Sequence, residues 1–520
     1  MKCKLFFEAQ NTKRKVKNMK KFLAILITLA LCTSLFAVAA VADENDGIVK
    51  VALNRNFNAL DGFTGNVVSM GVAYDLFDTL TIADGENNVQ PRLATAWEQI
   101  DDYNWRITLR EGVKFTNGED FTPESAVHSI HHAVSLGTTY QNWKQWGEAW
   151  PPTAAVESEN TIIITTPAPC MNLPVLLTRG AMIPLEASQE ESFWSNPIGS
   201  GPFKLVSWNV GVQVVVEANE EYWGGAPAVK GVQYDIITDG DAREAIIRTG
   251  EYDYVVNVPM DFAVEMKNNN TTPMELVEHP TTSSWYFYFN GTSDNPLVHN
   301  PTFREALIYA IDHQPICDFL LAGVVDSGKS ISPLYLRGAY DAGGYPERNV
   351  EKAQQLLKEA GYNGEPITFI YSGEQFNNDM EILELIMSEL QEVGVNVEYM
   401  EVDSSTWKSQ YKNSGVYDIA CNSYGGTYTG DTEMYYTQGV RDIGWTIEAA
   451  EELLKKTYTP GITDEERIKC LEEIMKISWE HKPYLWGSES LGTFAKNPKL
   501  EGVFILPTAQ ISFTNAYFEK

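Results

Sequence analysis

Residues 379–399 read DMEILELIMSELQEVGVNVEY and contain the signals of a helix that leads directly into a strand. Apolar side chains recur at helical spacing as far as Val393, and Gly394 supplies the left-handed residue with which helices commonly end. From Val395 to Tyr399 apolar and polar residues alternate, as they do in a half-buried strand. A helix joined closely to a strand is the building unit of α/β proteins, so this stretch predicts an α/β fold.

Helix and strand patterns alternate in the same way from Ile48 to the C-terminus. The sequence predicts a strand over 48–53, a helix opened by Thr122-Pro123, a helix over 302–313, a helix over 349–360 that stops at Gly361, and a helix that a capping box opens at Thr463 and that runs through Ser478. No repeat with a period of 20–50 residues is present in the sequence, which disfavours solenoids and propellers.

Length and charge narrow the class of protein. A chain of 520 residues exceeds the size at which one hydrophobic core stops growing, about 250–300 residues, so two or more packed units are expected. Its 70 acidic residues outnumber the 39 basic ones and give a formal net charge of −31. This charge repels nucleic acids and anionic membranes, and it suits a soluble exported protein better than it suits a trap for cationic ligands.

The N-terminal residues predict export. Lys20 and Lys21 precede an apolar run, and Ala40-Val41-Ala42 forms a small-x-small cleavage site, so residues 1–42 are interpreted as an N-terminal extension plus a secretory signal peptide. A membrane anchor and a lipid-modified Cys32 are the alternatives, and both are disfavoured by the residues around them. The predicted location is the periplasm or the outer face of the cytoplasmic membrane.

The cysteines that follow the leader show no metal or redox spacing. None of them forms a C-x-x-C pair, and a chain of this length does not depend on disulfides, so buried free thiols are expected although three pairings are possible. These residues are Cys170, Cys317, Cys421 and Cys470.

Ordered sequence blocks make the chain similar to a known family. They are RLATAW at 92–97, WRITLREGVKF at 105–115, NGEDFT at 117–122, GSGPFK at 199–204, YWGGAP at 222–227, FREALIYAID at 303–312, and the residues Ala353, Leu356, Leu357 and Glu359 to Tyr362. In this order they resemble the extracellular solute-binding proteins, family 5, of ABC transporters, the group that contains oligopeptide-, dipeptide- and nickel-binding proteins. The resemblance spans essentially the whole chain after the leader.

The resemblance implies a two-lobed periplasmic-binding-protein-like fold of type II, with three subdomains and a hinge between the lobes. Lobe 1 would comprise residues 43–282 with a peripheral subdomain at about 85–195, lobe 2 residues 283–486, and residues 487–520 would return to lobe 1. A polar, proline-containing loop at 294–296 after a strand at 285–290 suggests that the chain changes lobes near 280–300. The family mechanism is capture of a solute between the lobes and its delivery to the membrane permease.

The residues expected to choose the ligand depart from the family pattern. Peptide-binding relatives hold the α-amino group with a tryptophan-glycine-aspartate stretch, and the similar stretch here is Tyr424-Gly425-Gly426-Thr427-Tyr428, with Thr427 in the aspartate position and Asp431 four residues on. Glu374 stands where dipeptide binders carry an arginine. With Trp285 these residues form the predicted ligand site. The departures leave open a longer peptide, a cationic or neutral small solute that aromatic faces attract, or a metal–chelator complex.

Other classes of function receive weaker support from the sequence. His128, His131 and His132 share a predicted helix, but the pattern is too loose to predict a metal site, so no metal and no cofactor are expected. No hydrolase motif is present in the sequence, and no catalytic residue is proposed, although a secreted hydrolase is the alternative from another class. The expected partners are a peptide or small-molecule ligand and the permease subunits, and the expected state is a monomer.

Overall fold

The computed structural model describes residues 47–64, 67–84, 88–137, 143–269, 271–320, 328–372, 378–403, 406–412, 414–424, 430–506 and 508–519. The predicted leader lies outside these residues. The stretch at 379–401 forms helix α11 (Asp379–Glu392) and strand β14 (Val397–Glu401), with Gly394 at a φ of 97° between them. The strand begins two residues later than predicted, and the α/β fold class is confirmed.

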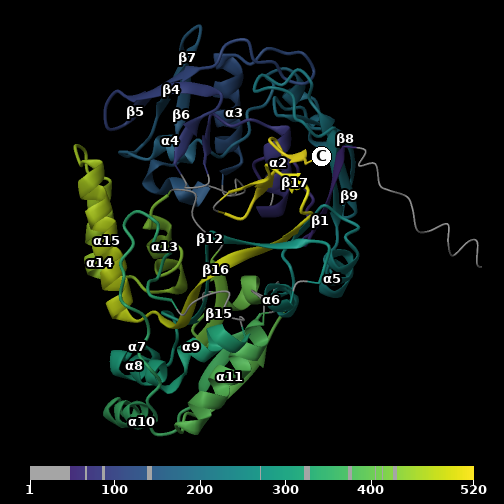
Figure 1. Ribbon diagram of the computed structural model, residues 1–520. Coiled ribbons are helices and arrows are strands. Elements are labelled where there is room, and N and C mark those ends of the chain that lie inside the picture. Colours follow the sequence, from purple (N-terminus) through teal and green to yellow (C-terminus); the bar gives the residue numbers. More distant parts are fainter. Residues whose placement is uncertain are drawn as a thin grey trace, which may run out of the picture. The chain divides into compact units, whose positions relative to one another are not determined.

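A mixed sheet holds most of the strands. Within the described residues its ten strands follow the order β14, β13 (Ile367–Tyr371), β15 (Ile419–Tyr424), β12 (Glu275–Phe289), β16 (Tyr484–Lys496), β11 (Tyr254–Val256), β1 (Ile48–Leu53), β10 (Gly231–Ile236), β9 (Gln213–Ala218) and β8 (Phe203–Asn209). Strand β13 pairs in parallel with β14 and β15, and β1 pairs in parallel with β11. Strands β12 and β16 lie side by side at the centre and pair antiparallel over most of their length (Figure 1).

A second, antiparallel sheet lies between β1 and β8 in the chain. In the described part of the chain it has four strands in the order β4 (Ala94–Gln99), β5 (Asn104–Leu109), β7 (Thr161–Thr165) and β6 (Thr153–Ser158), and helix α3 (Pro123–Ser135) packs on it. The predicted cap of α3 is present, since the Thr122 hydroxyl accepts from the Ser125 backbone N–H and the Ser125 hydroxyl accepts from the Thr122 N–H. This segment coincides with the predicted peripheral subdomain, whose bounds stay a prediction.

The remaining elements are mostly helical. The helices are α2 (Val67–Leu76), α4 (Leu173–Leu176), α5 (Gly240–Thr249), α6 (Met260–Asn269), α7 (Pro296–His299), α8 (Pro301–Ala310), α9 (His313–Pro315), α10 (Val350–Glu359), α13 (Glu433–Thr437), α14 (Glu448–Thr457) and α15 (Asp464–His481). The short helical turns are η2 (Trp143–Ala149), η3 (Ala187–Gln189), η4 (Phe193–Ser195), η5 (Ile316–Leu320), η6 (Trp407–Tyr411) and η7 (Arg441–Ile443). The short strands are β2 (Thr81–Ala83), β3 (Val89–Pro91), β17 (Leu500–Glu501), β18 (Phe504–Ile505), β19 (Ile511–Ser512) and β20 (Tyr517–Phe518). Among the described residues, none of the helices combines the length and the apolar character that a membrane crossing requires.

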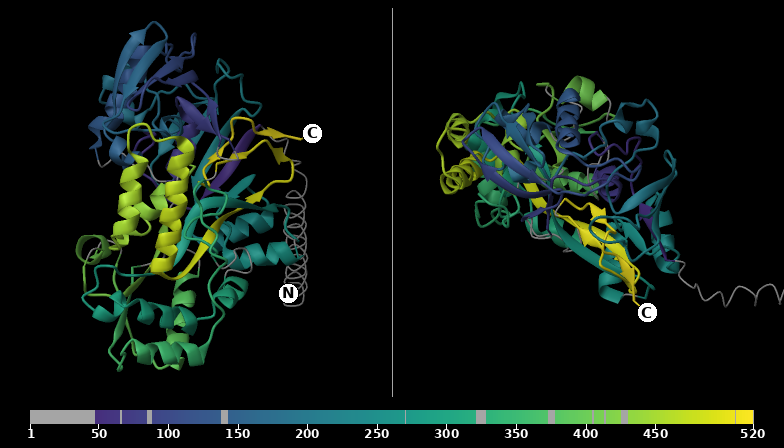
Figure 2. Two further views of the ribbon diagram at one scale, coloured as in Figure 1. Left: turned by 90° about the vertical axis from the view of Figure 1, so that its left-hand side faces the viewer. Right: turned by 90° about the horizontal axis from the view of Figure 1, so that it is seen from above.

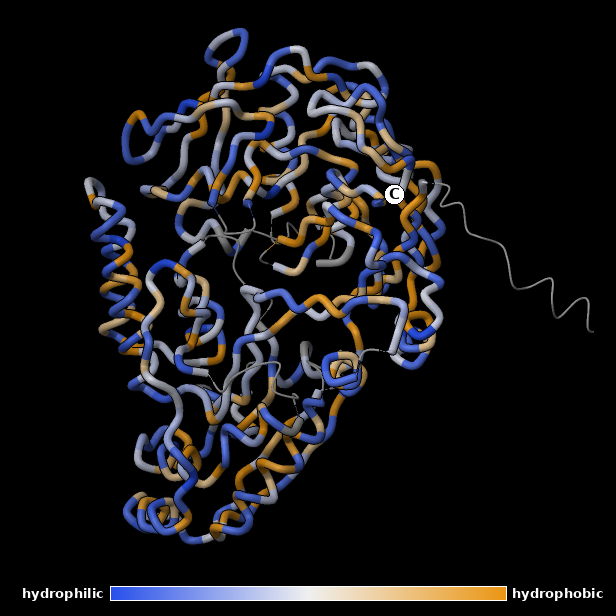
Figure 3. Tube along the Cα trace, viewed as in Figure 1, coloured by the Kyte–Doolittle hydropathy of each residue, from blue (hydrophilic) through white to orange (hydrophobic). Residues whose placement is uncertain are grey.

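The buried apolar side chains of the described residues gather into separate clusters. The first core draws on residues 49–254 and 494–516, and the second core draws on residues 286–486. A smaller cluster of residues from 52, 247–274 and 495 lies on α5, α6 and the strands beside them. Figure 3 shows the apolar stretches along the central strands and the polar residues on the connecting loops. The predicted lobe boundaries at 282/283 and 486/487 are not tested by these clusters and stay a prediction.

The C-terminal residues complete the first core. Asp75 of α2 is fully buried and accepts hydrogen bonds from the Ser512 hydroxyl (2.8 Å), the Phe513 backbone N–H (3.3 Å) and the Tyr234 hydroxyl (2.5 Å). Burial raises the pKa of Asp75 to about 6, although the three donors pull it down. The last strands are therefore tied to a helix more than 400 residues earlier in the chain.

Two local details differ from the expectation, while the predicted change of lobe near 280–300 stays a prediction. The polar stretch at 294–296 does not carry the chain between the cores, since the Asn295 side chain accepts from the Leu297 N–H and caps α7. The crossing is made by β12 itself, which is ten residues longer at its start than the predicted strand at 285–290. The cysteines Cys170, Cys317, Cys421 and Cys470 are buried free thiols, as predicted.

Candidate functional site

Strands β12 and β16 connect the two cores. Their paired halves at 275–280 and 491–496 lie beside β11 and the first core, and their halves at 284–289 and 484–489 lie beside β15 and the second core. The pairing is regular on both sides of a break, where Pro280 faces Leu491 and Ser284 faces Glu489. Residues 281–283 therefore lie opposite Ser490 alone, which is a β-bulge, and bulges bend and twist a strand locally.

Buried hydroxyl groups hold the bulge in place. The Thr281 hydroxyl lies 2.9 Å from both the carbonyl oxygen and the hydroxyl of Ser490. The Tyr435 hydroxyl donates to the carbonyl oxygen of Thr282, so α13 of the second core contacts the bulge directly. The Thr282 hydroxyl is buried without a hydrogen-bond partner among the described groups. The bulge is thus anchored by the Thr281 side chain and by the Thr282 carbonyl group, and not by the Thr282 hydroxyl.

Polar and aromatic groups surround this crossing. The Leu334 N–H donates to the Glu489 carboxylate at 3.3 Å, and the neighbouring Tyr335 ring is 49% exposed. Partial burial raises the pKa of Tyr335, and the nearby Glu489 carboxylate raises it further. Trp285 lies opposite Ser488 and packs against the second core with part of its ring exposed. An exposed phenol and a carboxylate therefore meet beside the bulge, whereas Trp285 lies on the other face of the strands.

Sequence reasoning missed two of these groups. Glu489 is the sole acidic residue of β16, in a run of apolar and small residues, and this isolation was the signal that marks it. Tyr335 lies two residues after Pro333 in the irregular segment after residue 328, and no local pattern distinguishes it. They meet only because the segment at 334–335 folds back on β16, more than 150 residues away in the chain.

Most of the predicted ligand residues lie outside the described part of the chain. This holds for Glu374 and for Gly425, Gly426, Thr427 and Tyr428, so their role stays a prediction. Tyr424 is the last residue of β15 and lies opposite Ser284, which places its backbone at the bulge. Of the predicted residues, Trp285 and the Tyr424 backbone are the ones that lie at the crossing.

Asp431 lies in a buried ion network. It is 1% exposed and accepts from the Arg467 guanidinium at 2.9 Å, while the same guanidinium donates to Glu433 at 2.9 Å. The Tyr458 hydroxyl also donates to Glu433. Burial raises the pKa of Glu433, and Arg467 opposes that rise. These contacts give Asp431 a structural role in the second core, and its predicted role in ligand binding remains untested.

The histidines of α3 are held by separate neighbours. The His128 ring lies 2.8 Å from the Ser188 hydroxyl, the His131 ring accepts from the Ala154 N–H at 3.3 Å, and the His132 ring stacks on Trp194. Burial lowers the pKa of His128 and of His132. Within the described ranges, no three side chains of the metal-binding types come together.

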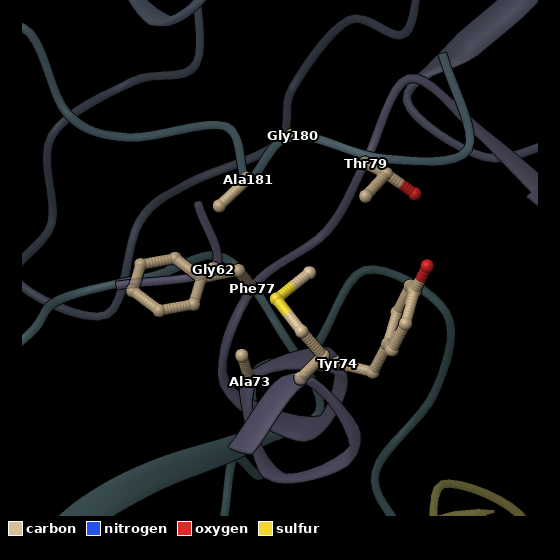
Figure 4. A pocket seen from close by; sticks show the side chains of 8 residues that line it. Gly62, Ala73, Tyr74, Phe77, Thr79, Gly180 and Ala181 are labelled. Atoms are coloured by element: carbon tan, nitrogen blue, oxygen red, sulfur yellow. The ribbon is translucent and has the colours of Figure 1, made fainter. Parts of the chain in front are cut away.

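Two pockets lined by described residues are too small for a peptide. The first encloses about 10 Å³, room for about one water molecule, and is shown in Figure 4. Its lining is Gly62, Met70, Ala73, Tyr74, Phe77, Thr79, Gly180 and Ala181. The second, between Tyr345, Trp479 and Tyr484 in the second core, encloses about 70 Å³. Ligand pockets usually measure about 300–1,000 Å³, so neither of these two holds a drug-sized solute.

The Figure 4 pocket has a rigid polar wall. The Tyr74 hydroxyl donates to the Thr178 carbonyl at 2.8 Å, and the Arg179 guanidinium lies 5.2 Å from the centre of the Tyr74 ring. Arg179 in turn donates to Gln510 and Thr508 of the C-terminal segment. This wall joins three distant parts of the first core, which is a stabilising role.

Comparison with known proteins gives consistent matches. A model of the family described as bacterial extracellular solute-binding proteins, family 5 Middle, matches residues 88–443. The glutathione-binding protein GsiB of Salmonella typhimurium is 25% identical over 514 residues, which cover 94% of this chain and 98% of that protein.

Solved structures with the same fold are also found. The ABC transporter substrate-binding protein CtaP of Listeria monocytogenes matches with a TM-score of 0.79 at 18% identity, covering 90% of this chain and 99% of that chain. The dipeptide-binding protein of Pseudoalteromonas sp. SM9913, in complex with Met-Leu, matches with a TM-score of 0.77 at 20% identity, covering 91% of this chain and all (100%) of that chain. These similarities extend over almost the whole chain rather than over one part of it.

Proposed function

Because the chain belongs to the bacterial extracellular solute-binding proteins, family 5, we propose that it captures a peptide or a similar small solute between its two cores and delivers it to the permease of an ABC uptake transporter. The relatives support the peptide class, since one is named for glutathione and another was solved with Met-Leu. The proposal includes export through the leader at 1–42, action as a monomer, and binding without catalysis.

The observation that carries the proposal is the pair of crossing strands with its bulge. The first and second cores are built from different parts of the chain, and β12 and β16 run from one to the other. Two rigid bodies that share a few connecting residues close around a ligand by changing the backbone angles of those residues. Residues 281–283 are the candidates, because they lie where regular pairing is interrupted. We place lobe 1 at 43–282 with 487–520, and lobe 2 at 283–486.

The chemistry beside the bulge suits a ligand with a positive end. The Glu489 carboxylate attracts an ammonium group, and the face of the neighbouring Tyr335 ring attracts cations and packs against apolar side chains. The α-amino group of a peptide meets these requirements. Closure would exclude water and strengthen the contact between the two charges.

Native mass spectrometry of the purified protein tests the proposal first, because it identifies a ligand carried through purification. Titration calorimetry with a peptide library, of three to six residues per peptide, then measures affinity. We expect Glu489→Gln to weaken peptide binding at least tenfold. Glu278→Gln is the matched control, because Glu278 pairs with Lys267 on the half of β12 that lies beside the first core, and this variant should bind as the wild type does. Absence of heat with every peptide would remove the peptide class.

A small cationic solute is the second candidate function. The same carboxylate and the Tyr335 ring favour it, and it agrees with the position of Glu374 in the sequence. Quaternary amines distinguish the two candidates, because they carry the charge without a peptide backbone. Binding of such an amine, lost in Glu489→Gln, together with no binding of peptides, would select this candidate.

A further inference from the structure

The segment around the four-stranded sheet also touches the second core through contacts outside the crossing strands. Contacts join the loop before β5 and the turn η2 on one side to η7 and to the connection between α14 and α15 on the other (Figure 2). We call this set of contacts the latch. Its members are Asp102, Lys144 and Gly147 on the first side and Asp442, Tyr458 and Gly461 on the second.

Gly147 is the point of closest approach in the latch. Its φ of 51° and ψ of −130° belong to a region that side-chain-bearing residues rarely adopt. A Cβ atom at this position would lie 2.2 Å from the Tyr458 hydroxyl oxygen and 3.1 Å from a carboxylate oxygen of Glu433. Glycine is therefore required twice, by the backbone conformation and by the surface that it faces.

The surface that faces Gly147 cannot move aside easily. The Tyr458 hydroxyl donates to Glu433, whose other carboxylate oxygen accepts from Arg467 at 2.9 Å. Moving Tyr458 would break the first of these bonds and disturb a charge pair that is almost completely buried. The Cys170 thiol lies close enough to Arg467 and Glu433 for both to influence its pKa, and its backbone N–H donates to Asp102. The groups that face Gly147 are thus linked, through Glu433 and Cys170, to the loop that carries Asp102.

The rim of the latch consists of separable polar contacts. The Lys144 ammonium lies 2.5 Å from the Asp442 carboxylate, with both side chains more than a third exposed. The Gly461 N–H donates to the Asp102 carboxylate at 3.1 Å. Exposed ion pairs of this kind contribute little each and weaken in salt, so a surface built from them can part and rejoin.

We infer that the latch sets the balance between the open and closed arrangements of the two cores, and that Gly147 is the positioning residue on which closure depends. The inference rests on the proposed function, since it assumes that the cores move about β12 and β16. If the latch acts in this way, the affinity for the ligand is determined partly by residues outside the ligand site. If only the closed arrangement binds tightly, the apparent dissociation constant is the intrinsic one divided by the closed fraction.

Distances between spin labels test the inference without any ligand. Cysteines replace the exposed Glu124 of α3 and Glu472 of α15, and pulsed dipolar spectroscopy measures their separation. We expect Gly147→Ala to lower the ratio of closed to open molecules at least tenfold. Gly118→Ala is the matched control, because Gly118 also has a positive φ, of 93°, but nothing lies within 4 Å of its added Cβ. Tyr458→Phe combined with Gly147→Ala removes the clashing oxygen and should restore part of the closed population.

A charge exchange provides a second test that does not involve backbone strain. Lys144→Asp and Asp442→Lys should each lower the ratio of closed to open molecules by about threefold to tenfold. The double exchange should restore this ratio, because the pair then has opposite charges again. Unchanged distances in folded Gly147→Ala, or no recovery in the double exchange, would overturn the inference. If the distances respond to Gly147→Ala as expected but the wild type binds no peptide, the result would instead count against the proposed function, so the two failures can be told apart.

Discussion

Replacing Arg467 by Met should destabilise the second core strongly. The substitution leaves the carboxylates of Asp431 and Glu433 facing each other without the guanidinium that bonds to both. Arg467 is 3% exposed, Asp431 1% and Glu433 8%, so water cannot take over the role of the arginine. Removal of one member from a buried ion pair costs about 3–5 kcal/mol, and the unfolding free energy should fall by about that amount.

The loss should depend on pH in a definite direction. Burial raises the pKa of Glu433, and without Arg467 the hydrogen bond from the Tyr458 hydroxyl is left to oppose the rise. A carboxyl whose folded pKa lies above its unfolded value favours the folded state at low pH and loses this advantage as the pH rises through the folded pKa. The deficit of Arg467→Met relative to the wild type should therefore be largest at pH 8 and should shrink towards pH 5.

Urea denaturation at the two pH values measures both effects. Lys469→Met is the matched control on the same helix, because the ion pair of Lys469 with Glu465 is exposed and its loss should leave the urea midpoint unchanged. Equal midpoints for the two variants, or a deficit that grows as the pH falls, would refute the buried network as the reason for the effect.

Three further substitutions have expected outcomes that follow from single contacts. Because the pKa of Asp75 is raised to about 6, its contribution to the unfolding free energy is fully present below about pH 4 and is lost as the pH rises through about 6. Asp75→Asn should abolish this pH-dependent contribution of about 3 kcal/mol, which urea denaturation at pH 4 and pH 7 measures. Thr122→Ala removes the cap of α3 and should lower the unfolding free energy by about 1 kcal/mol, measured by thermal denaturation. Trp486→Ala empties a fully buried site of the second core and should cost about 3–5 kcal/mol, and a loss below 1 kcal/mol would mean that the core collapses around the gap.

Local signals predicted the architecture well. The caps at Thr122 and Thr463 lie within a residue of where their helices begin, and the glycines at 361 and 394 take the expected left-handed conformation. These features depend on neighbours within a few residues, so the sequence contains them directly. The resemblance to solute-binding proteins of family 5 and the predicted fold are confirmed by the family match and the solved relatives.

Features that depend on distant residues were not predictable in the same way. Nothing near Asp431 indicates that Arg467 lies against it, and nothing near Glu489 indicates that Leu334 and Tyr335 do. A polar loop at 294–296 has the composition of a linker, yet its asparagine caps a helix. Local composition indicates exposure and turn formation, whereas contacts between residues distant in the sequence depend on which strands pair.

The hydrogen bonds from Ser512 and Phe513 to Asp75 have a consequence for how the chain matures. The donor residues are separated from the acceptor by more than 430 positions, so they are synthesised long after it. Until they emerge, a carboxyl in the interior of the first core lacks two of its donors, and shortly before that residues 494–496 of β16 are still missing from their place beside β11. Closing so long a span carries an entropic cost that only the finished polypeptide offsets. A ribosome-bound or translocating intermediate would thus remain incompletely packed at its beginning, and trimming a dozen residues from the carboxyl end should impair the part of the molecule that is made first.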